Sequence, residues 1–281
     1  MPPRMPPSPL PTDVQPATRR VLVVEDSPLN RMLVTAILAQ AGHRADTADN
    51  GLEALMAAQA GGYDLILMDL SMPEMDGLTA TRLLRDLPGA AGRIPVIAMT
   101  ADTDEADRIR CRDAGMNDHV AKPVDRSQLL ETVEKWLRAS DASGLSAGFH
   151  SCAPSACGTA DEVLDREVLD QLAQDLDADL LADVLRQFVD ETRERVDRIV
   201  VETDRAILTR EAHTLKSTAG TFGARSLCNA ARALEMACRA SPAVEGGAGK
   251  DGADTVERLR GDIPRLAGDA ITAYRAAGYL A

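Results

Sequence analysis

Acidic, hydroxyl and basic side chains follow four apolar runs in the first half of the chain. VLVV is followed by Glu25 and Asp26, LILM by Asp69, VIAM by Thr100, and HVA by Lys122. If these runs are parallel strands, their carboxyl ends meet at one edge of a sheet, where ligands bind. We therefore expect three carboxylates, one hydroxyl and one ammonium group to converge there.

This set of groups suits phosphoryl transfer. Clustered carboxylates repel one another unless a cation or a proton relieves them. A hard cation such as Mg²⁺ takes carboxylate and phosphate oxygens as ligands. With Asp69 as the nucleophile, the metal, Lys122 and the Thr100 hydroxyl could hold a phosphoryl group by position and charge.

A second candidate is His213, in the segment EAHTLKSTAGTFGA (211–224). On a helix at about 100° per residue, the apolar side chains of this segment gather opposite His213, so we expect its ring to face solvent. Lys216 and three small or hydroxyl-bearing residues flank it at helical spacing: Thr209, Ser217 and Gly220. A neutral imidazole is a nucleophile near pH 7, and small neighbours would let another protein approach it. Gly220 and Gly223 indicate a close approach or a helix end.

Strands and helices alternate from residue 20 to residue 139. Strands are expected at 21–26, 44–47, 64–70, 94–100 and 117–123, with helices of 10–15 residues between and after them. This alternation predicts an α/β domain with a doubly wound, five-stranded parallel sheet.

The remaining segments divide by composition. Residues 1–19 are proline-rich and predict a disordered leader, and residues 140–162, rich in Ser, Ala and Gly, predict a flexible linker. Residues 163–281 show no strand pattern. Helices expected near 165–174, 177–200, 203–221, 224–240 and 254–276 predict an antiparallel helix bundle.

The motifs VLVVEDSPLN, LILMDLSMPEMDG, VIAMTA and AKP, in this order and spacing, resemble the receiver domain of bacterial response regulators, with its flavodoxin-like fold. The resemblance implies that Asp69 accepts a phosphoryl group. It also implies that Glu25, Asp26, Asp69 and the Ser71 carbonyl hold Mg²⁺, and that Thr100 and Lys122 bind the phosphoryl group. His119 stands where the family has an aromatic switch residue that moves together with Thr100.

The segment AHTLKSTAGTFGA and the preceding LDREVLDQLAQDL resemble histidine-containing phosphotransfer domains, which are four-helix bundles. This resemblance implies that His213 carries a phosphoryl group, with Lys216 beside it. Thr209, Ser217, Gly220 and Gly223 would form the surface on which a receiver docks. Ser217 departs from the glycine common in the family.

Composition and charge limit the partners and the cellular location that we expect for this protein. The formal net charge of −13 disfavours nucleic acid and anionic membranes as partners. No apolar run reaches the roughly 18 residues of a membrane span, and no secretory signal is visible. Five cysteines without metal-ligand spacing suggest reduced thiols, so we expect a cytoplasmic protein.

We interpret the sequence as a two-domain phosphorelay protein that is not itself a kinase, because no ATP-binding loops are visible. Its expected partners are a sensor histidine kinase or another phosphotransfer protein, and the receiver domain of another response regulator. The receiver would catalyse its own phosphorylation and dephosphorylation. Two alternative functions remain. The chain could be a receiver switch whose helical domain only docks or dimerises, or a phosphate sink for a kinase.

A flavin-binding site at the same edge of the sheet would need glycine-rich phosphate loops and flanking aromatic residues, and the sequence shows neither.

Overall fold

The structure is a computed structural model that describes residues 18–100, 105–141, 163–176, 178–240 and 249–280. The predicted leader, except for its last two residues, lies outside these ranges, as does the predicted linker from residue 142 onward. Among the described residues, no helix combines the length and the apolar character that crossing a membrane requires.

The first half of the chain contains the five-stranded sheet predicted from the sequence. All neighbouring strands are parallel, in the order β2-β1-β3-β4-β5. The strands are β1 (Arg20–Val24), β2 (Arg44–Ala48), β3 (Leu65–Asp69), β4 (Val96–Thr100) and β5 (Asp118–Ala121). Strand order reverses between β1 and β3, so both strands deliver their carboxyl ends to the crevice where doubly wound sheets bind ligands.

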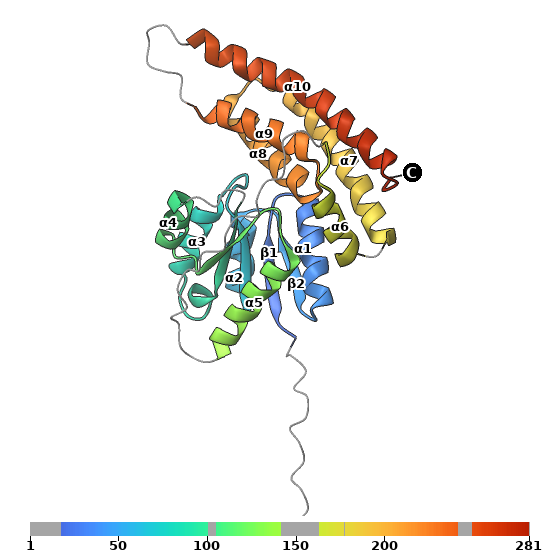
Figure 1. Ribbon diagram of the computed structural model, residues 1–281. Helices are drawn as coiled ribbons and strands as arrows, with labels where there is room; N and C mark the ends of the chain where they lie inside the picture. Colours follow the sequence, from blue (N-terminus) through green and yellow to red (C-terminus); the bar gives the residue numbers. More distant parts are fainter. Residues whose placement is uncertain (1–17, 101–104, 142–162, 177, 241–248, 281) are drawn as a thin grey trace, which may run out of the picture.

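Helices cover both faces of this sheet (Figure 1). They are α1 (Pro28–Gln40), α2 (Gly51–Ala60), α3 (Gly77–Arg85), α4 (Glu105–Asp113) and α5 (Arg126–Asp141), with the short 3₁₀ helix η1 (Ala91–Arg93) before β4. Three of them begin at capping side chains: Ser27, Asn50 and Asp76 accept hydrogen bonds from backbone N–H groups in the first turns of α1, α2 and α3. Such caps satisfy amides that a helix leaves unpaired. Each helix therefore begins at a defined residue soon after a strand end.

The second half is helical. Its helices are α6 (Arg166–Asp175), α7 (Ala178–Val201), α8 (Arg205–Thr221), α9 (Arg225–Arg239) and α10 (Gly249–Ala276). Helices α7 to α10 pack in a ring of neighbours, α7 on α8, α8 on α9, α9 on α10 and α10 on α7. This arrangement is the predicted four-helix bundle, with α6 as an additional helix at one end.

Three aromatic side chains hold the bundle core together. The Phe188 ring lies 5.2 Å from the Phe222 ring and 6.0 Å from the Tyr274 ring, centroid to centroid. The Tyr274 hydroxyl also donates a hydrogen bond to the carbonyl oxygen of Phe222. Aromatic pairs of this kind contribute about 0.5–1.5 kcal/mol beyond their burial. They fix the C-terminal end of α8 against α7 and α10.

The two halves are in contact. Helix α1 packs against α7 and α8, and one continuous cluster of buried apolar side chains includes residues from both halves. In Figure 1 the bundle lies across one end of the sheet domain, with α6 beside α1. The carboxyl ends of the strands therefore face the helix that carries His213.

Candidate phosphoryl-transfer site

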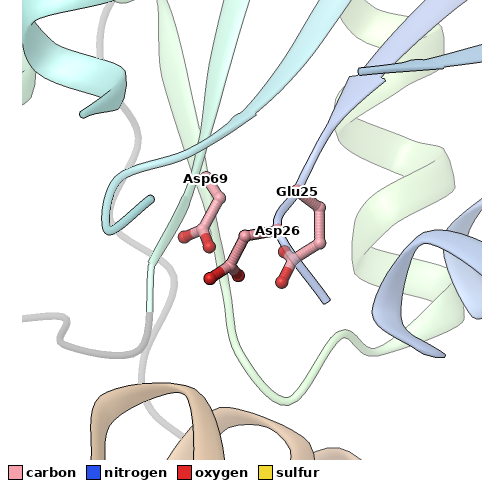
Figure 2. Close-up of side chains that lie close together, drawn as sticks. All are labelled: Glu25, Asp26 and Asp69. Atoms are coloured by element: carbon pink, nitrogen blue, oxygen red, sulfur yellow. The ribbon is translucent and has the colours of Figure 1, made fainter. Parts of the chain in front are cut away.

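Three carboxylates gather at the carboxyl ends of β1 and β3, as the sequence predicted. Oxygen atoms of Glu25, Asp26 and Asp69 all lie within 4.8 Å of one another. Figure 2 shows the three side chains projecting into the same space, Asp69 from the end of β3 and the other two from the end of β1. Asp69 is 3% exposed and Glu25 is 1% exposed. Their mutual repulsion is therefore poorly screened by water.

Lys122 supplies a cation to this cluster from the end of β5. Its Nζ lies 2.6 Å from Glu25 Oε2 and 2.9 Å from Asp69 Oδ2. Burial opposes the charge of the Lys122 ammonium, but the Asp69 and Glu25 carboxylates outweigh that effect and raise its pKa. The Lys122–Pro123 peptide bond, which follows β5, is cis.

The single ammonium group does not balance three acids. Burial and the neighbouring Glu25 carboxylate raise the pKa of Asp26 to about 6 and that of Asp69 to about 7, although Lys122 works in the opposite direction. Without another cation, both carboxyl groups therefore titrate closer to neutral pH than an ordinary aspartate does.

The loop after β3 keeps the Asp69 side chain in place. The Ser71 N–H lies 3.4 Å from Asp69 Oδ1, and the Gly77 N–H donates to the Leu70 carbonyl at 3.1 Å. A Cβ atom on Gly77 would come within 2.1 Å of the Asp69 carbonyl oxygen, so only glycine fits there. Thr100, at the end of β4, is buried and lines the same pocket as Asp69 and Ser71.

The site fits a divalent cation. Its donors are carboxylate oxygens, the ligands that Mg²⁺ prefers. Burial is the main cause of the raised pKa values of Asp26 and Asp69, and the Glu25 carboxylate raises them further. A cation would relieve the repulsion from Glu25, and Glu25, Asp26 and Asp69 offer oxygen atoms that could bind it.

The prediction that His213 faces solvent is wrong, because the residue is only 7% exposed. Its Nδ1 lies 2.7 Å from Glu235 Oε1 on α9, and its ring lines a pocket shared with Asp69. The helical pattern accounted neither for Glu235 on the neighbouring helix, which contacts the ring, nor for the receiver residues that line the same pocket.

Glu235 is a site residue that the sequence analysis missed. It is 2% exposed, and it accepts contacts from His213 Nδ1, Lys216 Nζ and Arg239 Nη2, each at 2.7 Å. Burial would raise the pKa of the Glu235 carboxyl, but His213 and Lys216 outweigh it and lower that pKa to about 2. A signal was available, since Glu235 falls at helical spacing on the apolar face of α9 with Leu227 and Ala231.

Asp69 and His213 line one pocket of about 540 Å³ between the two halves. Arg239, from the end of α9, and Thr100 line it as well. The imidazole is close enough to Asp69 for its charge to lower the pKa of that carboxyl, against the larger effects of burial and Glu25. With Nδ1 bonded to Glu235, Nε2 is the ring nitrogen left for chemistry in this pocket.

Two of the expected docking residues lie against the first domain. Ser217 Oγ accepts a hydrogen bond from Asn30 Nδ2 at 3.3 Å, and a Cβ atom on Gly220 would lie 4.0 Å from Pro123 Cδ. Thr214, which the sequence analysis did not single out, places its Oγ1 3.5 Å from Asp26 Oδ2. Small and hydroxyl-bearing residues on α8 thus permit the close approach of the two halves.

The other expected docking residues have local partners. Thr209 donates its hydroxyl to the Arg205 carbonyl at 2.7 Å. Gly223 has a φ of +72°, and a Cβ atom there would lie 3.0 Å from the Asp165 carbonyl oxygen. Gly223 therefore ends α8, which is one of the two roles that the sequence indicated for it.

His119, which stands at the position of the family's aromatic switch residue, is buried beside Asp118. Burial together with the charge of Arg108 lowers the pKa of His119.

Both halves of the chain match known protein families. The family model of the response regulator receiver domain matches residues 21–134, and that of the Hpt domain, the histidine-containing phosphotransfer domain, matches residues 183–269. The chain is a receiver domain followed by an Hpt domain. This pair places it among the proteins of two-component phosphorelays.

Curated relatives of the receiver–Hpt chain include histidine kinases. The sensor histidine kinase GacS of Pseudomonas protegens is 31% identical over 264 residues, which cover 90% of this chain and 27% of the relative. The signal transduction histidine-protein kinase BarA of Escherichia coli is 31% identical over 235 residues, covering 81% of this chain and 25% of the relative. The chain therefore spans about a quarter of the length of these two relatives.

Solved structures resemble the receiver half. The receiver domain of a Pseudomonas aeruginosa sensor histidine kinase, described with a magnesium ion in its active-site cleft, is 38% identical; the match covers 43% of this chain and 99% of that one, with a TM-score of 0.41. A Saccharomyces cerevisiae complex of a histidine phosphotransfer protein with the receiver of its downstream regulator gives 28% identity, 42% and 88% coverage, and a TM-score of 0.40.

Proposed function

We propose that Asp69 and His213 exchange a phosphoryl group within one chain. The observation that carries this proposal is the shared pocket, which both residues line together with Thr100. A receiver and an Hpt domain in one polypeptide could each serve separate partners. Here the nucleophile of each domain faces the same space.

The reaction follows from the groups in the pocket. Nε2 of a neutral His213 attacks the phosphorus of an acyl phosphate on Asp69, a bond between nitrogen and phosphorus forms, and the bond to the Asp69 oxygen breaks. The electron pair stays on Asp69 as a carboxylate. The Nδ1 proton stays in the hydrogen bond to Glu235, which supports the positive charge that develops on the ring. The reverse reaction uses the same groups.

The surrounding residues hold the reactants. Lys122 and the Thr100 hydroxyl bind the phosphoryl oxygens on the receiver side. Mg²⁺, held by Glu25, Asp26, Asp69 and the Ser71 carbonyl, would neutralise phosphoryl charge when bound. Arg239 adds a cation at the wall of the pocket, and Lys216 keeps Glu235 ionised. Holding donor and acceptor in one cavity supplies much of the rate.

The partners follow from this exchange. A sensor histidine kinase or another phosphotransfer protein supplies the phosphoryl group to Asp69, and the receiver domain of another response regulator takes it from His213. Such a protein works beside its kinase in the cytoplasm. Transfer between an acyl phosphate and a phosphohistidine needs no ATP site in this chain.

The proposal is tested by labelling the whole chain with radioactive acetyl phosphate and Mg²⁺. Phosphohistidine is stable in base, whereas acyl phosphate is not. We expect base-stable label in the wild type, only base-labile label in His213→Gln, and no label in Asp69→Asn or in EDTA. The proposal is refuted if wild-type Asp69 is labelled but His213 never is, or if Asp69→Asn labels His213 at the wild-type rate.

A further inference from the structure

A second contact between the two domains lies outside the phosphoryl-transfer pocket. At the C-terminal end of α6, the Asp175 carbonyl oxygen accepts a hydrogen bond from Gln40 Nε2 on α1 at 2.9 Å. Arg126, the first residue of α5, donates from Nη1 to Gln40 Oε1 at 2.6 Å, and its Nε lies 3.7 Å from Asp175 Oδ1. We call Gln40, Arg126 and Asp175 the clasp.

Each charge in the clasp stands at a helix end that disfavours it. The N-terminus of a helix carries a partial positive charge and the C-terminus a partial negative one. Arg126 begins α5 and Asp175 ends α6, so both oppose the dipole of their own helix. Docking brings the arginine to the negative end of α6 and the aspartate towards the positive end of α5. Docking thus offsets the unfavourable interaction of each charge with the dipole of its own helix.

The clasp also gives protein partners to groups that would otherwise bond to water. The last carbonyls of a helix have no partner within it, and Gln40 supplies one to α6. The Asp175 side chain is only 10% exposed, and Gln171 Nε2 orients it through contacts of 3.2 Å to both carboxylate oxygens. A pair that is partly buried and oriented in this way contributes more than a freely exposed one.

None of the three clasp residues lines the pocket that Asp69 and His213 share. The clasp can therefore influence which receiver domain docks over His213 without contacting the reacting atoms. We propose that the clasp is a specificity determinant that makes the chain's own receiver the preferred partner of His213. This inference rests on the proposed exchange between Asp69 and His213.

The test compares transfer within one chain with transfer between two whole chains. The donor chain carries His213→Gln and is labelled on Asp69 with acetyl phosphate; the acceptor chain carries Asp69→Asn. Arg126→Ala in the acceptor frees its Asp175 for the donor's receiver, so transfer between chains should rise about fivefold. The same substitution in the donor should lower it about fivefold, which corresponds to about 1 kcal/mol.

Transfer within one chain provides the second arm. Arg126→Ala and Asp175→Ala should each slow the step from Asp69 to His213 about fivefold without changing the rate at which acetyl phosphate labels Asp69. Arg126→Lys, which keeps a positive charge near Asp175, should retain more of the step than Arg126→Ala. The matched control is Asp170→Ala, an exposed aspartate on the same helix. Equal rates in the clasp variants and the control, or equal rates in Arg126→Lys and Arg126→Ala, would overturn the proposal.

Backbone hydrogen exchange separates this inference from the proposed function, because it needs no phosphate. Exchange along α1 and α6 should be faster in Arg126→Ala than in Asp170→Ala. Equal exchange in the two variants refutes the clasp even if phosphoryl transfer is intact. If wild-type His213 is never labelled while Arg126→Ala still speeds exchange, the clasp stands as a docking contact and the proposed transfer fails.

Discussion

Glu235 organises the chemistry of the Hpt domain at the scale of single residues. One buried carboxylate contacts the imidazole of His213, the ammonium of Lys216 and the guanidinium of Arg239. An ionised carboxylate accepts hydrogen bonds and cannot donate them, so the proton of the neutral ring stays on Nδ1. The nucleophilic lone pair is then on Nε2, the other ring nitrogen.

Glu235→Gln should therefore weaken the fold in a pH-dependent way. The pKa of Glu235 is about 2 in the folded chain, against 4.5 normally. The ionised group thus adds stability that is fully present above about pH 4.5 and is lost as pH falls towards 2. We expect the variant to lose about 3 kcal/mol at pH 7, because Lys216 would be left buried without its carboxylate. The loss should shrink below pH 4.5.

Urea unfolding of wild type and variant at pH 7 and pH 3.5 measures this difference. Glu194→Gln, at an exposed position on α7, is the control and should have little effect at either pH. A constant difference between wild type and Glu235→Gln at both pH values would contradict the account.

Lys122→Ala should impair the receiver before transfer begins. The substitution removes the ammonium that contacts Glu25 and Asp69, so the acids repel one another more strongly and Asp69 holds its proton to higher pH. We expect labelling of Asp69 by acetyl phosphate to fall at least about 100-fold, as when a charge-stabilising donor is removed from other sites. Arg112→Ala removes an exposed cation from α4 and serves as the control. Labelling of Lys122→Ala within threefold of the wild type would refute this role.

At the residue scale, the sequence was informative wherever a side chain follows a strand end. Strands that are buried and parallel bring their last residues to one edge, so the meeting of Glu25, Asp69 and Lys122 could be predicted. The partner of His213 could not be read from local spacing in the same way. Glu235 is 22 residues away, and its position depends on how α9 packs against α8.

At the scale of elements, the turns after the strands determine the site as much as the strands do. Gly77, at the start of α3, lies directly against the backbone of Asp69. A Cβ there would lie 2.1 Å from the Asp69 carbonyl oxygen and 2.9 Å from Met68 Cγ. Neither the backbone of β3 nor the buried Met68 can move away without disturbing the sheet.

Gly77→Ala should consequently destabilise the chain by about 1–3 kcal/mol, the usual range for an overpacked core, and slow labelling of Asp69. Gly268→Ala in α10 is the matched control, because nothing lies within 4 Å of its added Cβ. That substitution should be neutral or stabilising, by up to about 1 kcal/mol. Thermal unfolding of both variants gives the comparison, and equal melting temperatures would count against the close packing at Gly77.

Element types and order followed from the sequence because their signals are local. Ser27 and Pro28 indicate the beginning of α1, and the short apolar runs between helices indicate buried strands. The cap at Asp204 likewise begins α8 close to the expected residue. Packing of the helices around α6 depends on long-range contacts such as that between Gly223 and Asp165, which no local pattern encodes.

At the scale of the whole molecule, His213 lies between Glu235 of its own bundle and a pocket that it lines together with receiver residues. A helical pattern reports whether a side chain points into its own bundle. It carries no information about a second domain on the other side. The interface depends on contacts such as that between Asn30 and Ser217, which are 187 residues apart in sequence.

The central claim is that Asp69 and His213 exchange a phosphoryl group within one chain, and dilution tests it most directly. Wild-type chain labelled on Asp69 is followed as label moves to His213 at protein concentrations that span about 100-fold. Because donor and acceptor share a pocket, the account predicts a first-order rate constant that does not change with concentration. A rate that falls in proportion to dilution, and equals that of a mixture of His213→Gln and Asp69→Asn chains, would contradict it.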